Sequence, residues 1–444
     1  MLCPPPPRIC DHNELENRWS AVWLRVSRST PDNMLPQPSL NAATAVRRDI
    51  LLRQRIMRDV TVFPQTDSAE APPIPFNKTA LHSGLSLLTP LSIPPEHPDH
   101  AHLERFRAYG GDVLRFASAM QSTWPPGVDR LQGSLSLFHK LWNCMRFTCV
   151  HLRGDEPLCP DTVGASDMDR WFLQRLNTTT ARVNDLFERN RLSGVCARLQ
   201  HLIRRDLSGW YLEFSRHHLD ERSTRQCIRY SLLHTAHLLH PFMPNITQEI
   251  FARVGPRPAK LLIHLPYPEF RSELVFRNAA RRIDIMRGLT EDIRRIIGRN
   301  SSPSVKGFDA ILTGDGNEAE KRWLSDHAED LRRLAGIGDL HFQSDPPPRA
   351  FRGGHGHWSV HIPITDARSH ATILRGMRRE REELNRRIHR MQRKLADREY
   401  LESLPPGTTQ RWKRRLQQET RRRERLIRTL GWISTPEERR EKKK

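Results

Sequence analysis

The 444-residue chain contains no run that approaches the ~20 consecutive apolar residues of a membrane-spanning helix. The sequence therefore predicts neither an integral membrane protein nor a membrane partner. Its seven cysteines form no Cys-x-x-Cys pair, which argues against a zinc ribbon, and their odd number argues against a disulfide scaffold. His355 and His357 have no third and fourth ligand nearby, so we expect no metal site and no cofactor.

Acidic residues are also scarce relative to basic ones, with 51 Asp and Glu against 72 Lys and Arg and a net charge of +21. An excess of this size favours a partner made of phosphates, or an acidic assembly, over a small metabolite. The excess is concentrated at the end of the sequence, because residues 366–444 contain 25 basic and 12 acidic side chains. We therefore expect this segment to contact that partner.

Residues 1–100 are repeatedly interrupted by proline, which ends helices and is excluded from central strands. Only residues 13–25 and 48–57 have helical spacing, so the segment is predicted to be partly irregular. One Arg precedes Asp11, Glu14 and Glu16, whereas targeting peptides avoid acidic residues. Mitochondrion and cytoplasm therefore both stay open as localisations.

In residues 101–256 the apolar residues recur at the spacing of amphipathic helices, as in Leu135, Phe138, Leu141 and Met145. Several such helices with short connections predict an antiparallel bundle. Residues 257–365 mix two patterns. The expected strands are 261–265, 308–312 and 358–364, and the expected helices are 277–297 and 318–335. This alternation is typical of a small α/β appendage.

Residues 366–444 return to helical spacing, with a heptad seam and a Pro-Gly turn at residues 404–407. The seam consists of Met377, Leu384, Ile388, Met391 and Leu395. The inward side chains of a second helix are expected to be Trp412, Leu416, Ile427 and Leu430. Together these segments predict a mainly α fold that ends in an antiparallel helical hairpin.

Several strings in the bundle resemble class I aminoacyl-tRNA synthetases. Tyr109–Phe116 (YGGDVLRF) is similar to the YGADALRF segment that leads into their anticodon-binding helical bundle. Phe138–Phe147 resembles the F-x-N-K-L-W-N-x-x-R-F helix of the valyl branch, and Asp169–Asn177 resembles its D-x-W-I-L-S-R-L-N. Further resemblances follow in family order at Trp210–Glu213, at Leu238–Glu249, and at Arg393–Leu401 followed by Pro405. The resemblance covers about residues 75–433 and implies the anticodon-binding domain and C-terminal coiled coil of valyl-tRNA synthetase.

The catalytic and editing parts of that family have no counterpart in the sequence. Residues 75–85 resemble the strand before the KMSKS loop, yet residues 88–95 lack the Lys that holds the ATP phosphates. Some 20 residues separate the two helical pieces near residue 40, where the family has several hundred, including the HIGH motif. The resemblance therefore implies that residues 1–100 are a degenerate remnant of the catalytic domain, without catalytic residues.

The resemblance also implies which residues bind RNA. In the family the bundle reads the anticodon and the coiled coil contacts the outer corner of the tRNA, and Arg and Lys on helices bind phosphates. On the bundle the candidates are Lys140, Asn143, Arg146, Arg204 and Arg205. On the hairpin they are Arg386, Arg387, Arg390, Arg393, Lys394, Arg411, Lys413, Arg414, Arg415, Arg421, Arg422 and Arg423. The alternative is a solvated helical surface, with these arginines paired to glutamates such as Glu380 and Glu383.

The leading hypothesis is an RNA-binding protein that resembles valyl-tRNA synthetase, binds tRNA or ribosomal RNA, and does not aminoacylate. Its basic character suits recruitment to a ribonucleoprotein such as a mitochondrial ribosome, with ribosomal or synthetase-complex proteins as partners. One alternative is a valine–tRNA ligase whose catalytic part lies in a separate chain or is missing from the gene model. The other is a scaffold whose hairpin pairs with another helix, which salt-insensitive binding would favour.

Overall fold

The structure is a computed structural model, and the chain divides into two units, Met1–Ala280 and Arg281–Lys444. It describes residues 14, 15, 18, 19, 46, 47, 50, 51, 53, 54, 57, 58, 109–121, 126–154, 156–160, 162–256, 261–300, 308–314, 316, 318–348, 350–364, 367–397 and 408–433. The expected turn at 404–407 and the segment 75–95 lie outside these residues. None of the described helices combines the length and the hydrophobicity that a membrane span requires.

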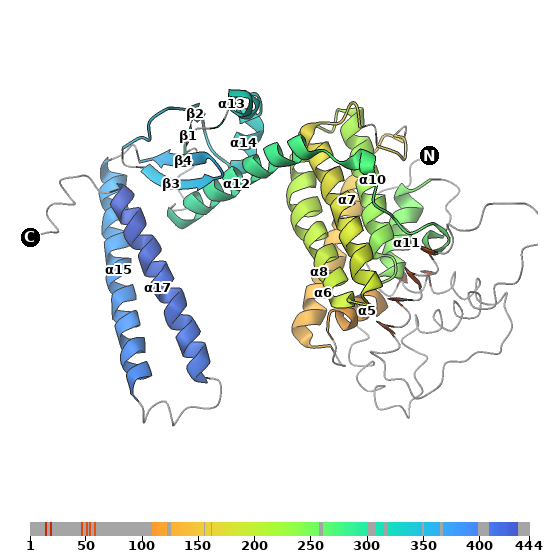
Figure 1. Ribbon diagram of the computed structural model, residues 1–444, viewed down its shortest axis with the longest axis horizontal. Helices are drawn as coiled ribbons and strands as arrows, with labels where there is room; N and C mark the ends of the chain where they lie inside the picture. The colour runs from red at the N-terminus through yellow and green to blue at the C-terminus, as the bar shows by residue number, and fades with distance from the viewer. Residues whose placement is uncertain are drawn as a thin grey trace, which may run out of the picture. The chain divides into compact units, whose positions relative to one another are not determined.

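The first unit is a bundle of helices packed side by side (Figure 1). Its main helices are α5 (Gly111–Ala119), α6 (Val128–His151), α7 (Asp167–Glu188), α8 (Leu192–His201), α10 (Arg222–Leu239) and α11 (Pro244–Val254). A π-helical segment, η5 (Leu202–Tyr211), and α9 (Leu212–Ser215) continue α8 without a break. Side chains that the sequence spacing places inward are buried, among them Phe138, Leu141 and Met145. The predicted helical bundle is confirmed.

Local signals set the ends of these helices. The Ser166 hydroxyl accepts a hydrogen bond from the Asp169 N–H at 3.1 Å, and the Asp169 carboxylate accepts one from the Ser166 N–H at 3.1 Å. This capping box begins α7, and Pro244 occupies the first turn of α11. Asn190, with φ at 54°, lies in the left-handed region between α7 and α8. The chain reverses there, so α7 and α8 become neighbours.

The second unit contains a four-stranded mixed sheet with the strand order β2-β1-β4-β3. The strands are β1 (Ala310–Gly314), β2 (Leu340–Phe342), β3 (Ala350–His355) and β4 (Trp358–Pro363), and the helices before the hairpin are α12 (Arg277–Asn300), α13 (Glu318–Asp326) and α14 (Ala328–Ala335). β1 and β2 are parallel and joined through α13 and α14, whereas β4 is antiparallel to both β1 and β3. α12 approaches β3 so closely that a Cβ at position 288 would collide with the His355 ring, and Gly288 permits this approach.

The strand expected at 261–265 is wrong. Leu262–His264 form a 3-10 turn (η6), because the Leu262 N–H donates to the Gln248 side chain at 2.9 Å and both Leu262 and Ile263 are buried. The helix expected at 318–335 is divided at His327 into α13 and α14. β2 and β3 are not predicted by the sequence pattern, since β2 has three residues and β3 contains two adjacent glycines.

The hairpin consists of α15 (Ala367–Ala396) and α17 (Thr408–Ile433) (Figure 1). Glu380 accepts a hydrogen bond from Arg422 at 2.6 Å, and the Lys394 ammonium lies 5.2 Å from the centre of the Trp412 ring. As the residue number increases along α15, the number of the contacting residue on α17 decreases, so the two helices are antiparallel. The predicted mainly α fold with a terminal helical hairpin is confirmed.

The buried seam of the hairpin agrees with the heptad on α15 and differs from it on α17. Leu384 and Ile388 are buried as expected. On α17, Leu426 and Leu430 are buried, whereas Ile427 is 48% exposed. The prediction that Ile427 faces inward is therefore wrong by one residue. The residues that face α15 are Leu426 and Leu430, which lie four residues apart on one face of α17.

Candidate nucleic-acid interface

The strings that carry the family resemblance hold the bundle together from inside. The Asp112 carboxylate accepts hydrogen bonds from the N–H groups of Asn245 and Ile246, at 3.2 and 2.8 Å, at the start of α11. Burial raises the pKa of Asp112 to about 6, against the opposing effect of these two bonds. Arg115 donates to the carbonyls of Pro241 at 2.8 Å and residue 242 at 3.3 Å. Residues 109–116 therefore clamp the turn before α11.

A second buried network joins α7, η5 and α10. The Tyr211 hydroxyl donates to the Asp169 carboxylate at 2.7 Å, and the Thr224 hydroxyl donates to it at 3.1 Å. Burial raises the pKa of Asp169, although these bonds act in the opposite direction. The Phe172 and Tyr211 rings stack with their centres 4.5 Å apart, and Trp210, the residue before Tyr211, is also buried. Trp210 and Tyr211 therefore serve to pack the bundle.

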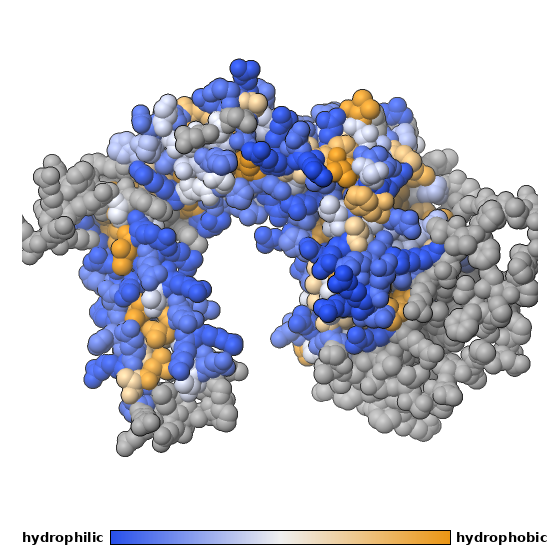
Figure 2. Space-filling view, viewed as in Figure 1, coloured by the Kyte–Doolittle hydropathy of each residue, from blue (hydrophilic) through white to orange (hydrophobic). Residues whose placement is uncertain are grey.

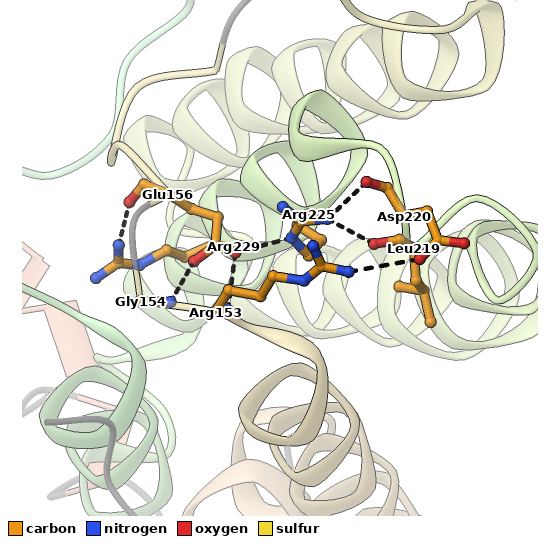
Figure 3. Close-up of polar contacts among 7 residues, drawn as sticks. All are labelled: Arg153, Gly154, Glu156, Leu219, Asp220, Arg225 and Arg229. Atoms are coloured by element: carbon orange, nitrogen blue, oxygen red, sulfur yellow. Dashed lines mark hydrogen bonds and ion pairs between the residues drawn. The ribbon is translucent and has the colours of Figure 1, made fainter.

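A buried ion pair lies at the end of the bundle where the loop after α6 meets α10 (Figure 3). Arg225 donates through Nε to the Glu156 carboxylate at 2.9 Å, and the Glu156 side chain is fully buried. The N–H groups of Arg153 and Gly154 donate to the same carboxylate, each at 2.9 Å. Burial by itself would raise the pKa of Glu156, but these hydrogen bonds together lower it. The carboxylate is therefore held ionised.

Arg225 and Arg229, one turn apart on α10, hold three chain segments together. Arg225 also donates to the carbonyls of Leu219 and Asp220, at 2.7 and 2.9 Å, in the loop before α10 (Figure 3). Arg229 donates to the Glu156 carbonyl and, through Nε, to the Val254 carbonyl at 2.9 Å. The loop after α6, the loop before α10 and the end of α11 are thus joined by guanidinium groups. These arginines are structural and are not available to a ligand.

Lys140 and Arg204, two of the expected RNA-binding residues, bridge α6 and η5. The Lys140 ammonium donates to the Ser208 hydroxyl at 3.1 Å, and Arg204 donates to the Gly133 carbonyl at 2.6 Å. Both side chains are half-buried. The structure therefore uses them to hold the two helical segments together, with part of each side chain still at the surface.

Further along α6, Asn143 is exposed and Arg146 is half-buried, and Arg205 is exposed on η5. The guanidinium of Arg216 lies over the half-buried Phe147 ring, 5.9 Å from its centre. The sequence reading missed this pair. The available signal was an aromatic residue next to Arg146 on a basic helix, because unpaired bases stack on aromatic and guanidinium planes.

Three of the expected hairpin residues are engaged within the hairpin itself. Arg422 is bonded to Glu380, Arg387 lies 3.8 Å from Glu383, and Lys394 lies over Trp412, whereas Arg423 is half-buried. The alternative of arginines paired to glutamates therefore holds for the flanks of the hairpin.

The other expected hairpin residues face solvent. Arg386, Arg390, Arg393, Lys413, Arg414, Arg415 and Arg421 are exposed, and their side chains form no ion pair or hydrogen bond within the described part of the chain. The side chain of Arg411 lies outside the described residues. Arg425 and Arg428 are exposed in the same way and were missed, although they continue the same α17 surface. In Figure 2 the hydrophobic colour is confined to the line between the two helices, and their outer surfaces are hydrophilic.

His234 and His237 on α10 are half-buried in the bundle, and His240, directly after α10, is buried. The His234 ring lies 2.9 Å from the Thr180 hydroxyl, and the fully buried His240 ring lies 2.8 Å from the Thr247 hydroxyl. Burial lowers the pKa of His234 to about 3 and that of His237 to about 4. Among the described residues no group of His, Cys, Asp and Glu side chains is arranged to hold a metal ion.

Comparison with known proteins shows what the bundle is similar to. Residues 169–306 match the family described as the anticodon-binding domain of tRNA ligase. The valine–tRNA ligase of Carboxydothermus hydrogenoformans is 28% identical over 359 residues, which cover 75% of this chain and 39% of that protein. The valine–tRNA ligase of Enterococcus faecalis is 26% identical over 312 residues, covering 67% of this chain and 35% of that protein.

The chain thus spans between a third and two-fifths of the length of these curated relatives. Among solved structures, the ternary complex of Agrobacterium radiobacter K84 agnB2 LeuRS, tRNA and LeuAMS covers 53% of this chain and 28% of its own chain. At 14% identity and a TM-score of 0.32, this similarity carries no argument. The family match and the relatives confirm the expected resemblance to valyl-tRNA synthetase and to its anticodon-binding domain.

Proposed function

We propose that this chain, which carries an anticodon-binding domain, binds tRNA or another structured RNA and does not itself attach an amino acid. The observation that supports this proposal most strongly is the combination of the match at residues 169–306 with a hairpin that exposes arginines on both helices. Arginines on helical surfaces bind phosphate oxygens through paired N–H groups, and the affinity comes largely from released counterions. A small-molecule substrate would need a concave, mostly apolar site rather than a convex basic one.

The two surfaces suit two parts of one RNA. On the bundle, Asn143 and Arg146 lie within one turn of Phe147 on α6, whose ring is covered by the Arg216 guanidinium, and Arg205 is exposed on η5. Such a combination suits unpaired bases, which stack on flat side chains and bond through their edges. Among the described side chains of the hairpin no aromatic patch is exposed beside the arginines, so the hairpin suits the phosphate backbone alone. We therefore assign loop recognition to the bundle and backbone recognition to the hairpin.

A substitution on α6 tests this assignment. The triple variant Asn143→Ala, Arg146→Gln, Phe147→Leu is expected to bind a tRNA about 10- to 30-fold more weakly, because it loses one base-stacking contact and two polar contacts. Fluorescence anisotropy with labelled tRNA at one fixed salt concentration measures this change. Lys140 is kept, since it holds α6 to η5.

The matched control is the variant Lys321→Gln, Arg322→Gln on the second unit, whose two exposed side chains lie outside both surfaces. It should bind tRNA like the native chain. A second control uses an RNA duplex without a loop, for which the α6 variant should keep its full affinity. Equal affinities of the α6 variant and the native chain for tRNA would contradict the assignment.

The absence of aminoacylation is part of the proposal and has its own test. Neither a HIGH nor a KMSKS string occurs in the 444 residues, so no phosphate-binding Lys of the family type is present in them. The purified chain with valine, ATP and tRNA is expected to form no valyl-tRNA above the level without protein. Charging by the chain alone would overturn this part, whereas charging after addition of a cell fraction would favour a separate catalytic chain.

We extend the proposal to a ribonucleoprotein, mitochondrial or cytoplasmic, as the place of action. Crosslinking of the tagged native protein followed by sequencing of the bound RNA tests it, and fractionation of the same cells gives the compartment. Enrichment of ribosomal RNA would support recruitment to a ribosome, and enrichment of valine tRNA would support a role beside an active ligase. Binding partners that are proteins alone, with no dependence on salt, would favour the helical scaffold instead.

A further inference from the structure

The hairpin is closed along one face of each helix. On α15 this face is formed by Leu384, Ile388 and Met391, and on α17 by Leu426 and Leu430, all of them buried. The polar contacts between the helices lie beside this seam, at the Arg422 and Glu380 pair and at Lys394 over Trp412. Each helix therefore has a back, opposite the seam, that the partner helix does not reach.

The back of α17 carries a row of arginines, with glutamines at the intervening positions 417 and 418. Arg414, Arg421, Arg425 and Arg428 are separated by seven, four and three residues, the spacing of one helical face, and all four are exposed. At 3.6 residues per turn this face lies about half a turn from Leu426 and Leu430. Of the acidic residues described on α17, Glu419 lies towards the seam, and Glu424 lies at the edge of this row, three residues after Arg421 and four before Arg428. We call these four arginines the α17 ridge, which is about 21 Å long at 1.5 Å per residue.

The back of α15 carries a second row. Arg386, Arg390 and Arg393 are separated by four and three residues, and all three are exposed. They lie about half a turn from Ile388 and Met391, which face α17. We call these three arginines the α15 ridge. Because the helices pack seam to seam, the two ridges point in opposite directions across two helix diameters, about 20 Å.

We propose that the hairpin binds two separate RNA helices at once, with one phosphate backbone along each ridge. This inference rests on the proposed function only for its assumption that RNA is the partner. An RNA helix seated on one ridge cannot reach the other, because the apolar seam and both helices lie between them. If a single RNA helix were the only ligand, one ridge would suffice. The second row of exposed arginines gives the hairpin the geometry of a spacer between two RNA helices.

The test measures whether the full chain brings two RNA duplexes together. Two unrelated RNA duplexes without loops, one labelled with a donor and one with an acceptor dye, are mixed with increasing amounts of protein. Energy transfer is expected to rise to a maximum and then to fall at excess protein, because each molecule then holds a single duplex. Loop-free duplexes are used so that the bundle surface is not addressed.

Two ridge variants decide which surfaces are responsible. The α17-ridge variant (Arg414→Gln, Arg421→Gln, Arg425→Gln, Arg428→Gln) and the α15-ridge variant (Arg386→Gln, Arg390→Gln, Arg393→Gln) should each still bind one duplex and lose the energy transfer. The summed log affinity for two duplexes should depend less steeply on log salt in each variant, by about 3 units, near 0.9 per lost phosphate contact. The Lys321→Gln, Arg322→Gln variant should keep both binding and transfer.

The outcomes separate this inference from the function it rests on. Duplex binding by the native chain without energy transfer would overturn the two-ridge hairpin and leave RNA binding intact. Energy transfer that persists in either ridge variant would also overturn it, since a protein dimer or the bundle would then supply the second contact. Failure of the native chain to bind any RNA would overturn both. Circular dichroism of each variant checks that the helices are retained.

Discussion

The Arg225→Met variant is expected to lower the free energy of unfolding of the bundle by about 3–5 kcal/mol. Arg225 is buried, and its guanidinium is bonded to the fully buried Glu156 carboxylate and to two carbonyls of the loop before α10. Methionine keeps an unbranched apolar side chain but removes the charge and the donors. The Glu156 carboxylate would then stay buried with only two backbone N–H donors, which costs more than losing a surface ion pair.

Arg153→Met is the matched control. Its guanidinium is 61% exposed and lies 3.4 Å from the exposed Asp220 carboxylate, at the edge of the same cluster. An exposed pair contributes about 0–1 kcal/mol, so this variant should unfold almost like the native chain. Hydrogen exchange of the α7 and α10 amides in urea follows the first unit separately from the second. Equal losses in the two variants would contradict a stabilising role for the buried pair.

The pH dependence of the free energy of unfolding tests the ion pair between Glu156 and Arg225 independently. The folded-state pKa of Glu156 is lowered, so its contribution is present above the ordinary carboxyl pKa of about 4.3 and is lost as the pH falls through the folded value. In Arg225→Met the acidic end of this dependence should be reduced, because the carboxylate no longer prefers the ionised form as strongly. An unchanged acid limb would mean that the backbone N–H groups alone hold Glu156 ionised.

The sequence predicts the helices of the bundle and of the hairpin well because their apolar residues must repeat with the helical period to form a core. It does not predict which polar residues meet inside that core. Glu156 and Arg225 are far apart in the sequence and lie in segments with no shared pattern, so only the fold brings them together. The strand expected at 261–265 fails for a related reason, since a short apolar run is compatible with any buried conformation.

The sequence likewise predicts the positions of some RNA-binding candidates and not the contacts of others. Arg386 and Arg390 follow from the heptad, because positions opposite a known seam must face solvent. Lys140 and Arg204 do not follow from it, since a basic residue on a helix next to another helix can bond across the contact, as both do here. Ile427 is expected in the seam and is exposed, because a shift of one residue along the helix moves a side chain from the seam to the flank.

Acidification from pH 7 to pH 5.5 is expected to lower the free energy of unfolding of the bundle by about 2–3 kcal/mol. His234, His237 and His240 have folded-state pKa values below the ordinary value of about 6.5, through burial and then through nearby positive groups at His234 and His240. The unfolded chain therefore binds more protons than the folded chain in this range. Stability that is present above pH 6.5 is lost as the pH falls towards the folded-state values.

Asp112 acts in the opposite direction and reduces the loss. Its folded-state pKa is raised to about 6, so the folded chain takes up this proton before the unfolded chain does. Each fully shifted histidine contributes about 1 kcal/mol between pH 7 and pH 5.5, and Asp112 returns a little less than that. The net effect keeps the sign of the three histidines.

A pair of histidine variants makes the prediction specific. His237→Gln should remove about 1 kcal/mol of the acid-dependent loss, whereas His217→Gln, at an exposed position, should leave the loss unchanged. Hydrogen exchange of the α10 amides, corrected for the intrinsic pH dependence of exchange, measures both. If stability were flat between pH 7 and pH 5.5, the three rings would have to be protonated within the folded bundle. The hydroxyls of Thr180 and Thr247 would then be accepting hydrogen bonds from imidazolium groups, a geometry that the same distances of 2.9 and 2.8 Å also allow.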